Sequence, residues 1–183
     1  MVGEDDIALL LLSRGANPNG LDDRQISPLS LVAISGRLDM AQALLDAGAD
    51  PDSGSSGGRT IVSPLGGAAG AGEVEMTALL IDAGAGPDAD VNSDDGMRLL
   101  PHASMYGYTD AMRLLLDAGA DPNGGYDRRA NTAGPLLIAV LGGRIEAVRM
   151  LLDAGANPQS ALLDGVRPAM LTQDREILDL LGW

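Results

Sequence analysis

The sequence predicts an all-α fold, a solenoid of stacked helix–turn–helix units, because one short phrase returns at a near-constant period. The phrase reads LLSRGANPN from Leu11, LLDAGADPD from Leu44, LLIDAGAGPD from Leu79, LLLDAGADPN from Leu114 and LLDAGANPQ from Leu151. Its Gly-Ala pairs begin at positions 15, 48, 84, 119 and 155, which gives spacings of 33, 36, 35 and 36 residues. A period of this size is typical of stacked repeat arrays, which offer a long surface rather than one deep pocket.

Helix start and stop signals define one repeat at residues 27–49. Ser27 is a suitable N-cap, and Pro28 fits the first helical position, where no backbone N–H needs a partner. Gly36 ends this first helix in a conformation that glycine adopts most easily. A second helix is predicted from about residue 38 to residue 46, and Gly48 ends it. The unit therefore consists of two short antiparallel helices followed by a loop.

The same unit recurs at 63–85, 98–120 and 134–156, and the two ends of the chain carry partial units. Residues 4–16 supply only a second helix, and residues 167–181 resemble a shortened closing unit. Such short helices bury their apolar faces by stacking on neighbours. We therefore predict a single domain over 1–183, and its parts are a partial unit at 1–26, full units at 27–62, 63–97, 98–133 and 134–166, and a cap at 167–183.

The repeated pattern resembles the ankyrin repeat. It reads [ST]-P-L-x-x-[AV]-A-x-x-G-x-[LIV]-[ED] and then L-L-x-A-G-A-[DN]-P-[ND], and it covers nearly the whole chain. The resemblance implies that a hairpin-like finger loop follows each helix pair. It also implies that the fingers and first helices line a concave face that binds another protein.

The chain departs from the ankyrin pattern in three ways. The family motif has His after Pro-Leu, whereas this chain has Ser30, Gly66 and Leu137, so the resemblance implies weaker ties between neighbouring loops. The displaced Pro101 predicts a late start for the first helix of the fourth unit. The glycines crowded into 63–73 predict the least stable part of the stack, at up to about 1 kcal/mol for each interior glycine relative to alanine.

Composition and charge exclude several classes of function. The chain has no cysteine, so disulfides, thiolate zinc sites and cysteine nucleophiles are excluded. Its acidic start and six-residue apolar run do not fit a secretory signal, so we expect a soluble, cytoplasmic protein. The net charge of −14 disfavours nucleic acid and anionic membranes as partners. This acidity either serves solubility alone or attracts a basic protein partner.

The sequence lacks the motifs of catalysis and cofactor binding. His102 is the single histidine, so neither a Ser–His–Asp triad nor a histidine metal site is indicated. The Gly-rich stretch at 54–60 lacks the order of a phosphate-binding loop. We expect no enzymatic activity and no cofactor.

An acidic loop invites a calcium interpretation, which its later positions do not support. Asp88, Asp90 and Asn92 match the first three ligand positions of a calcium loop. The sixth position, which should be Gly, is Ser93, and the twelfth, which should be Glu, is Leu99. We therefore expect solvated surface charge and no metal site.

The long spacings place extra residues in the finger loops at 50–62, 86–97 and 121–133. Insertions of this kind fall on one face of a repeat array, often the binding face, although neutral drift in a tolerant loop has the same appearance. One finger is strongly acidic and another combines tyrosine with arginine, as binding hot spots often do. The candidate residues in these fingers are Asp88, Asp90, Asp94, Asp95, Tyr126, Arg128 and Arg129.

A second group of candidates surrounds the mid-repeat glycine of the fourth unit. In the ankyrin pattern the two residues before this glycine face the concave side, and here they are Met105 and Tyr106, with Tyr108 just beyond Gly107. All three tyrosines of the chain thus fall in one unit and its finger. Ordinary packing is the alternative, and we favour a contact patch in this aromatic-poor chain.

These observations favour a non-catalytic module, most simply a monomer, that binds a protein partner through its concave face and fingers. Within this class a small stand-alone inhibitor, of the bacterial immunity or antitoxin type, fits the compact acidic chain. A fragment of a larger scaffold is a second reading. Ion or small-molecule binding in the acidic finger is a third.

Overall fold

The computed structural model describes residues 4–24, 26–53, 63–87, 99–124, 133–159 and 165–183. Every regular element within these residues is helical, which confirms the predicted all-α repeat fold. The chain divides into two compact units, Met1–Gly96 and Met97–Trp183. Each unit is described by itself.

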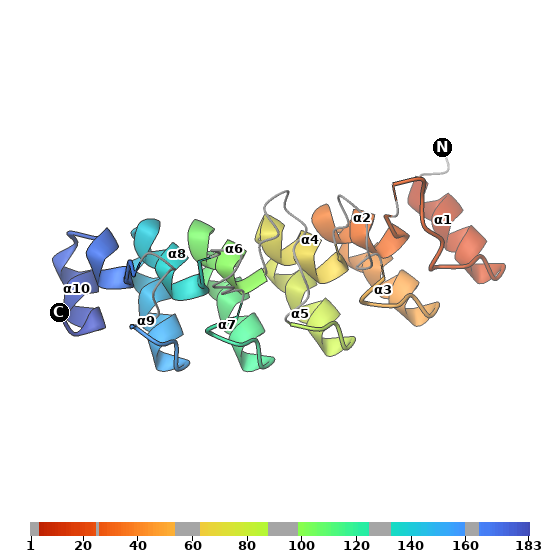
Figure 1. Ribbon diagram of the computed structural model, residues 1–183. Coiled ribbons are helices and arrows are strands. Elements are labelled where there is room, and N and C mark those ends of the chain that lie inside the picture. The colour runs from red at the N-terminus through yellow and green to blue at the C-terminus, as the bar shows by residue number, and fades with distance from the viewer. Residues whose placement is uncertain (1–3, 25, 54–62, 88–98, 125–132, 160–164) are drawn as a thin grey trace. The chain divides into compact units, whose positions relative to one another are not determined.

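The first unit consists of two helix pairs preceded by a single helix (Figure 1). Its helices are α1 (Glu4–Ser13), α2 (Pro28–Ile34), α3 (Leu38–Asp46), α4 (Pro64–Ala71) and α5 (Val74–Asp82). The first helices α2 and α4 lie against each other, and each packs on the second helix of its own repeat, α3 or α5. Helix α1 packs on α3 in the manner of a second helix, as the sequence predicts for residues 4–16.

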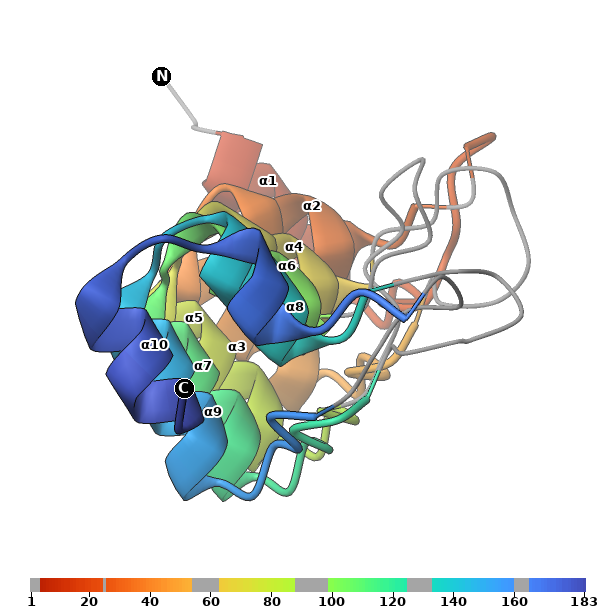
Figure 2. The same cartoon turned by 60° about the vertical axis from the view of Figure 1, so that its left-hand side comes forward.

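The second unit repeats this arrangement and ends in a shortened repeat (Figure 2). Its helices are α6 (Leu99–Tyr106), α7 (Thr109–Asp117), α8 (Pro135–Leu141), α9 (Ile145–Asp153), the 3-10 turn η1 (Pro168–Leu171) and α10 (Arg175–Leu181). Helix α6 packs on α8, α7 on α9, η1 on α8 and α10 on α9. The first helix of the closing repeat is thus reduced to one 3-10 turn.

Side-chain caps start the first helices α2 and α4 of the first unit, as the sequence predicts for Ser27. The Ser27 hydroxyl accepts a hydrogen bond from the Ser30 N–H at 3.1 Å, and the Ser63 hydroxyl accepts one from the Gly66 N–H at 3.0 Å. These bonds satisfy donors that a helix cannot pair internally. Each cap is followed by proline at the first helical position.

The late start predicted for the fourth repeat is wrong. Helix α6 begins at Leu99, which is equivalent in the repeat to Pro28 and Pro64. The displaced Pro101 is the third residue of this helix, and N–H groups in the first turn have no intrahelical partner to lose. The helix therefore keeps its register.

The core uses the same three positions in each full second helix. All these side chains are at most 6% exposed. They are Met40, Ala41 and Leu44 in α3, Met76, Thr77 and Leu80 in α5, Ala111, Met112 and Leu115 in α7, and Ala147, Val148 and Leu151 in α9. Small residues at many of these positions let the thin helices pack closely.

Side chains at the end of the repeated phrase join neighbouring loops in the first unit. Asn19 donates from Nδ2 to the Gly48 carbonyl at 3.0 Å and accepts from the Asp50 N–H at 2.7 Å. One repeat later, Asp52 Oδ1 accepts from the Gly86 N–H at 3.0 Å. Loops that lack the family's histidine are therefore tied by Asn and Asp side chains.

Candidate protein-binding surface

Two of the candidate tyrosines flank a turn that requires glycine. Helix α6 ends at Tyr106, and Gly107 follows with φ of +74°. The N–H groups of Gly107 and Tyr108 both donate to the Ala103 carbonyl, at 2.9 and 3.0 Å. Any other residue would be strained at this φ. The turn brings the rings of Tyr106 and Tyr108 into a stack, with centroids 5.6 Å apart and planes 19° from parallel.

His102 extends this stack by one helical turn. Its ring centroid lies 4.8 Å from that of Tyr106, and the two planes are tilted by 48°. Burial lowers the pKa of His102, and its Nδ1 atom is buried with no hydrogen-bond partner among the described residues. The imidazole is therefore neutral at pH 7 and adds an aromatic ring, not a charge, to the cluster.

Arg144 closes one side of the cluster from the following repeat. Its Nε donates to the Met105 carbonyl at 3.2 Å. Its stem lies against Gly107, where an added Cβ would approach Arg144 Cδ to 3.1 Å. Glycine at 107 thus both permits the turn and leaves room for the arginine.

Sequence reasoning missed Arg144 and its neighbour Leu141. A signal was present in the repeat register, because Arg144 is equivalent to Tyr108 and Leu141 is equivalent to Met105. Leu141 is 60% exposed and Tyr106 is 47% exposed, while Met105 and Tyr108 are half-buried. We give the name Tyr106 patch to the five residues Met105, Tyr106, Tyr108, Leu141 and Arg144.

The Tyr106 patch has the composition of a binding hot spot. Aromatic rings offer a large contact area, and arginine adds directed hydrogen bonds. The rings already stack on one another, so a partner would immobilise little additional side chain.

The remaining candidates lie outside the described residues, and their roles stay predictions. They are Asp88, Asp90, Asp94 and Asp95 in the acidic finger, and Tyr126, Arg128 and Arg129 in the following finger. Within the described ranges, no group of three or more His, Asp or Glu side chains is arranged to hold a metal ion. The described helices include none long and apolar enough to cross a membrane.

The repeat geometry agrees with a comparison with known families. A model of three ankyrin repeats matches residues 65–161, and a model of one ankyrin repeat matches residues 24–53. The chain belongs to the ankyrin repeat family. Ankyrin repeats are protein–protein interaction modules and generally have no enzymatic activity, and neither matching family is catalytic. No curated protein matches the sequence.

Proposed function

We propose that this ankyrin repeat protein binds a protein partner through the Tyr106 patch. The observation that carries the proposal is the aromatic cluster of His102, Tyr106 and Tyr108, whose middle ring, Tyr106, contacts both others and is still 47% exposed. Tyrosine is enriched in binding hot spots, because its ring offers a large contact area and its hydroxyl a directed hydrogen bond. The ankyrin pattern also implies that this end of a first helix faces the concave side.

The neighbouring finger loops extend the proposed interface. Tyr126, Arg128 and Arg129 follow α7 of the same repeat in sequence and supply a second pairing of tyrosine with arginine. Four aspartates gather in the preceding finger, and the chain as a whole carries a net charge of −14. Such a field attracts a basic partner and raises its rate of association.

This charge supports a more specific role, that of an inhibitor which masks a basic surface of its partner. The partner would be blocked while its basic groups face the acidic finger. The alternative is a scaffold that holds its partner in position without blocking it. Both roles use the same patch, and an activity assay on the captured partner separates them. The cytoplasmic location and the monomeric state expected from the sequence also stay predictions.

Affinity capture with matched variants tests the proposal. The test variant carries Tyr106→Ser and Tyr108→Ser. Serine is compatible with the N-cap position that Tyr108 occupies before α7, so this variant should fold. The control variant carries Met170→Ser and Trp183→Ser, which remove two side chains that are also exposed.

We expect wild type and the control to retain one dominant protein from native lysate and the test variant to lose it. Circular dichroism must show equal helix content in all three proteins. Equal retention of that protein by the test variant would overturn the proposal. Loss from both variants would likewise argue against a contact specific to the Tyr106 patch.

A further inference from the structure

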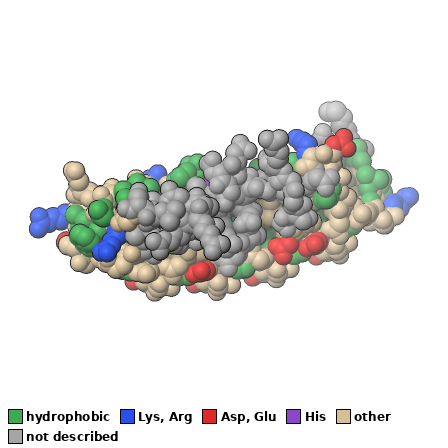
Figure 3. Space-filling model, in the orientation of Figure 1, with side chains coloured by type: hydrophobic (Ala, Val, Ile, Leu, Met, Phe, Trp, Pro, Cys, Tyr) green, Lys and Arg blue, Asp and Glu red, His purple; other side chains and the backbone are tan. Residues whose placement is uncertain are grey.

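Helix α1 leaves uncovered the face that every full second helix buries. Counting from the Gly-Ala pair, Ile7, Ala8 and Leu11 are equivalent to Met40, Ala41 and Leu44 of α3. The equivalent side chains in α3, α5, α7 and α9 are at most 6% exposed, whereas Ile7 is 50% and Leu11 is 55% exposed. Figure 3 shows hydrophobic side chains gathered over α1 on the surface.

Helix α2 is uncovered in the same way on the side that borders α1. Leu31 is 47% exposed, while its equivalents Gly67 in α4 and Ile138 in α8 are buried, Ile138 to 9% exposure. Pro28 is half-buried, whereas its equivalent Pro64 is buried. These positions are covered in α4 and α8 because another first helix, α2 or α6, packs on each.

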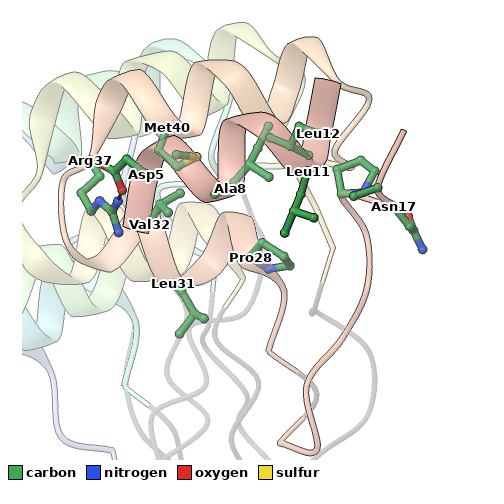
Figure 4. A pocket seen from close by; sticks show the side chains of 13 residues that line it. Asp5, Ala8, Leu11, Leu12, Asn17, Pro28, Leu31, Val32, Arg37 and Met40 are labelled. Carbon is green, nitrogen blue, oxygen red and sulfur yellow. Dashed lines mark ion pairs between the residues drawn. The ribbon is translucent and has the colours of Figure 1, made fainter. Parts of the chain in front are cut away.

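The two uncovered faces form one apolar groove (Figure 4). Its volume is about 340 Å³, and side chains of α1, α2 and α3 line it. Leu11 of α1 points toward Pro28 of α2, and Leu12 and Leu31 are also among the lining residues. An ion pair between Arg37 and Asp5 closes one end. The groove is thus bordered by a second helix and by the next first helix. Helices α2 and α6 each pack on the same two kinds of element, α2 on α3 and α4 and α6 on α7 and α8.

We propose that this groove docks an amphipathic helix of a partner protein that has the apolar face of a first helix. The repeats define that face as Leu followed by small or β-branched residues three and four positions later. The pattern occurs as Leu29, Val32 and Ala33, as Leu65, Ala68 and Ala69, as Leu100, Ala103 and Ser104, and as Leu136, Ala139 and Val140. Each of these side chains is at most 6% exposed in its own repeat.

This burial excludes a second copy of the chain as the donor of such a helix. All four copies of the pattern are core residues, so a second copy would have to unfold a repeat to present one. A helix of a separate protein can present such a face without the unfolding of a repeat. One end of the groove is acidic on balance, since the exposed Asp5 and Asp39 line an adjoining hollow together with a single cation, Arg37. The polar face of the docked helix should therefore carry lysine or arginine.

A stapled peptide is a suitable probe of the groove. It carries the sequence SPLSLVAISG of residues 27–36 with flanking lysines and a fluorescein label, and the staple offsets the low helicity of short free peptides. Fluorescence anisotropy measures its affinity for wild type, Leu11→Ser, Leu31→Ser and the control Met170→Ser. The three side chains are similarly exposed, so these variants should fold equally well.

We expect Leu11→Ser and Leu31→Ser each to weaken binding by about tenfold, the loss expected when a buried leucine contact is removed. Met170→Ser should bind as wild type does. A peptide that fails to bind wild type, or binds all four proteins equally, would overturn the proposal. So would a dimer detected by sedimentation and lost in Leu11→Ser, because a second copy would then cover the face.

A graft in cis provides an independent test of the groove. Gly3 is equivalent in register to Gly36, so residues 1–3 can be replaced by SPLSLVAISG without a change of phase. The grafted helix should raise the melting temperature and abolish binding of the stapled peptide. Unchanged stability together with unchanged peptide binding would show that the grafted helix leaves the groove empty and that the peptide binds elsewhere, which would overturn the proposal. The Tyr106 patch is untouched in every variant, so its partner binding is assessed separately.

Discussion

The side chain of Asn123 holds the backbone of Asn157, which lies one repeat further along the chain. Asn123 Oδ1 accepts a hydrogen bond from the Asn157 N–H at 2.8 Å, and its Nδ2 donates to the Gly155 carbonyl at 3.3 Å. Asn19 makes the equivalent pair of bonds in the first unit. Asn19 and Asn123, each the last residue of the repeated phrase, therefore join consecutive repeats through side-chain hydrogen bonds and also belong to a turn.

Removal of this tie should destabilise the second unit. We expect Asn123→Ala to lower the free energy of unfolding by about 1–2 kcal/mol, since it removes two exposed hydrogen bonds. Asn123→Asp retains the acceptor, as Asp52 does in the first unit, and should cost less. Urea denaturation of the three proteins measures both effects. If Asn123→Asp lost as much free energy of unfolding as Asn123→Ala, the stabilisation would come only from the bond that Nδ2 donates to the Gly155 carbonyl.

Two neighbouring glycines in the third repeat should respond to alanine in opposite directions. Gly70 lies within α4, and its equivalents Ile34 and Leu141 carry side chains, so Gly70→Ala should stabilise by up to about 1 kcal/mol. Gly72 follows the helix with φ of +76°, so Gly72→Ala should destabilise by about 1–2 kcal/mol. Thermal denaturation checks the pair. A destabilising Gly70→Ala would show that the close packing of α4 requires glycine there.

The buried imidazole should make stability depend on pH. Because burial lowers the pKa of His102, the unfolded chain takes up a proton more readily than the folded protein does. The neutral ring contributes its full stability at pH values above the pKa of His102 in the unfolded chain, which is near 6.5. This stability is lost as the pH falls through the lower pKa of His102 in the folded protein.

A substitution isolates this effect. His102→Leu introduces the residue found at the equivalent position Leu31. Between pH 7 and pH 5, the free energy of unfolding should fall more steeply in wild type than in this variant. Urea titrations at several pH values provide the comparison. Parallel profiles would mean that His102 is as accessible to protons in the folded state as in the unfolded state.

Ionic strength should slow the association with a basic partner. Screening shortens the range of the acidic field to about 8 Å at physiological salt, so the rate of association should fall markedly between low and physiological ionic strength. Asp94→Asn with Asp95→Asn should reduce this dependence and leave the dissociation rate nearly unchanged. Stopped-flow mixing with the captured partner measures both rates. A rate independent of salt would remove the steering role of the acidic finger.

The fold could be read from the sequence because its signals are local. The predicted second helix at 38–46 coincides with α3, since Gly36 and Gly48 end consecutive helices whatever surrounds them. The start of α6 differs from the prediction, because Pro101 taken alone indicates a late start, whereas Leu99 keeps the register of the first helical residue in the other repeats.

The site could be predicted only in part because its contacts cross between repeats. The rarity of tyrosine in this chain and the mid-repeat glycine beside them indicate Tyr106 and Tyr108 as candidates. The bond from Arg144 to the Met105 carbonyl joins residues 39 positions apart and has no sequence motif. The tie made by Asn123 was missed for a related reason, since an Asn in a loop is ordinarily read as a turn residue.

The most direct test of the central claim is site-specific photo-crosslinking at Tyr106. A benzophenone side chain replaces Tyr106 in one protein and Arg113, which is exposed on α7, in another. The two proteins are irradiated with the captured partner, and the products are identified by mass spectrometry. A partner crosslink from position 106 and none from position 113 is the predicted result. A crosslink from 113 with none from 106 would contradict the assignment of the binding surface to the Tyr106 patch.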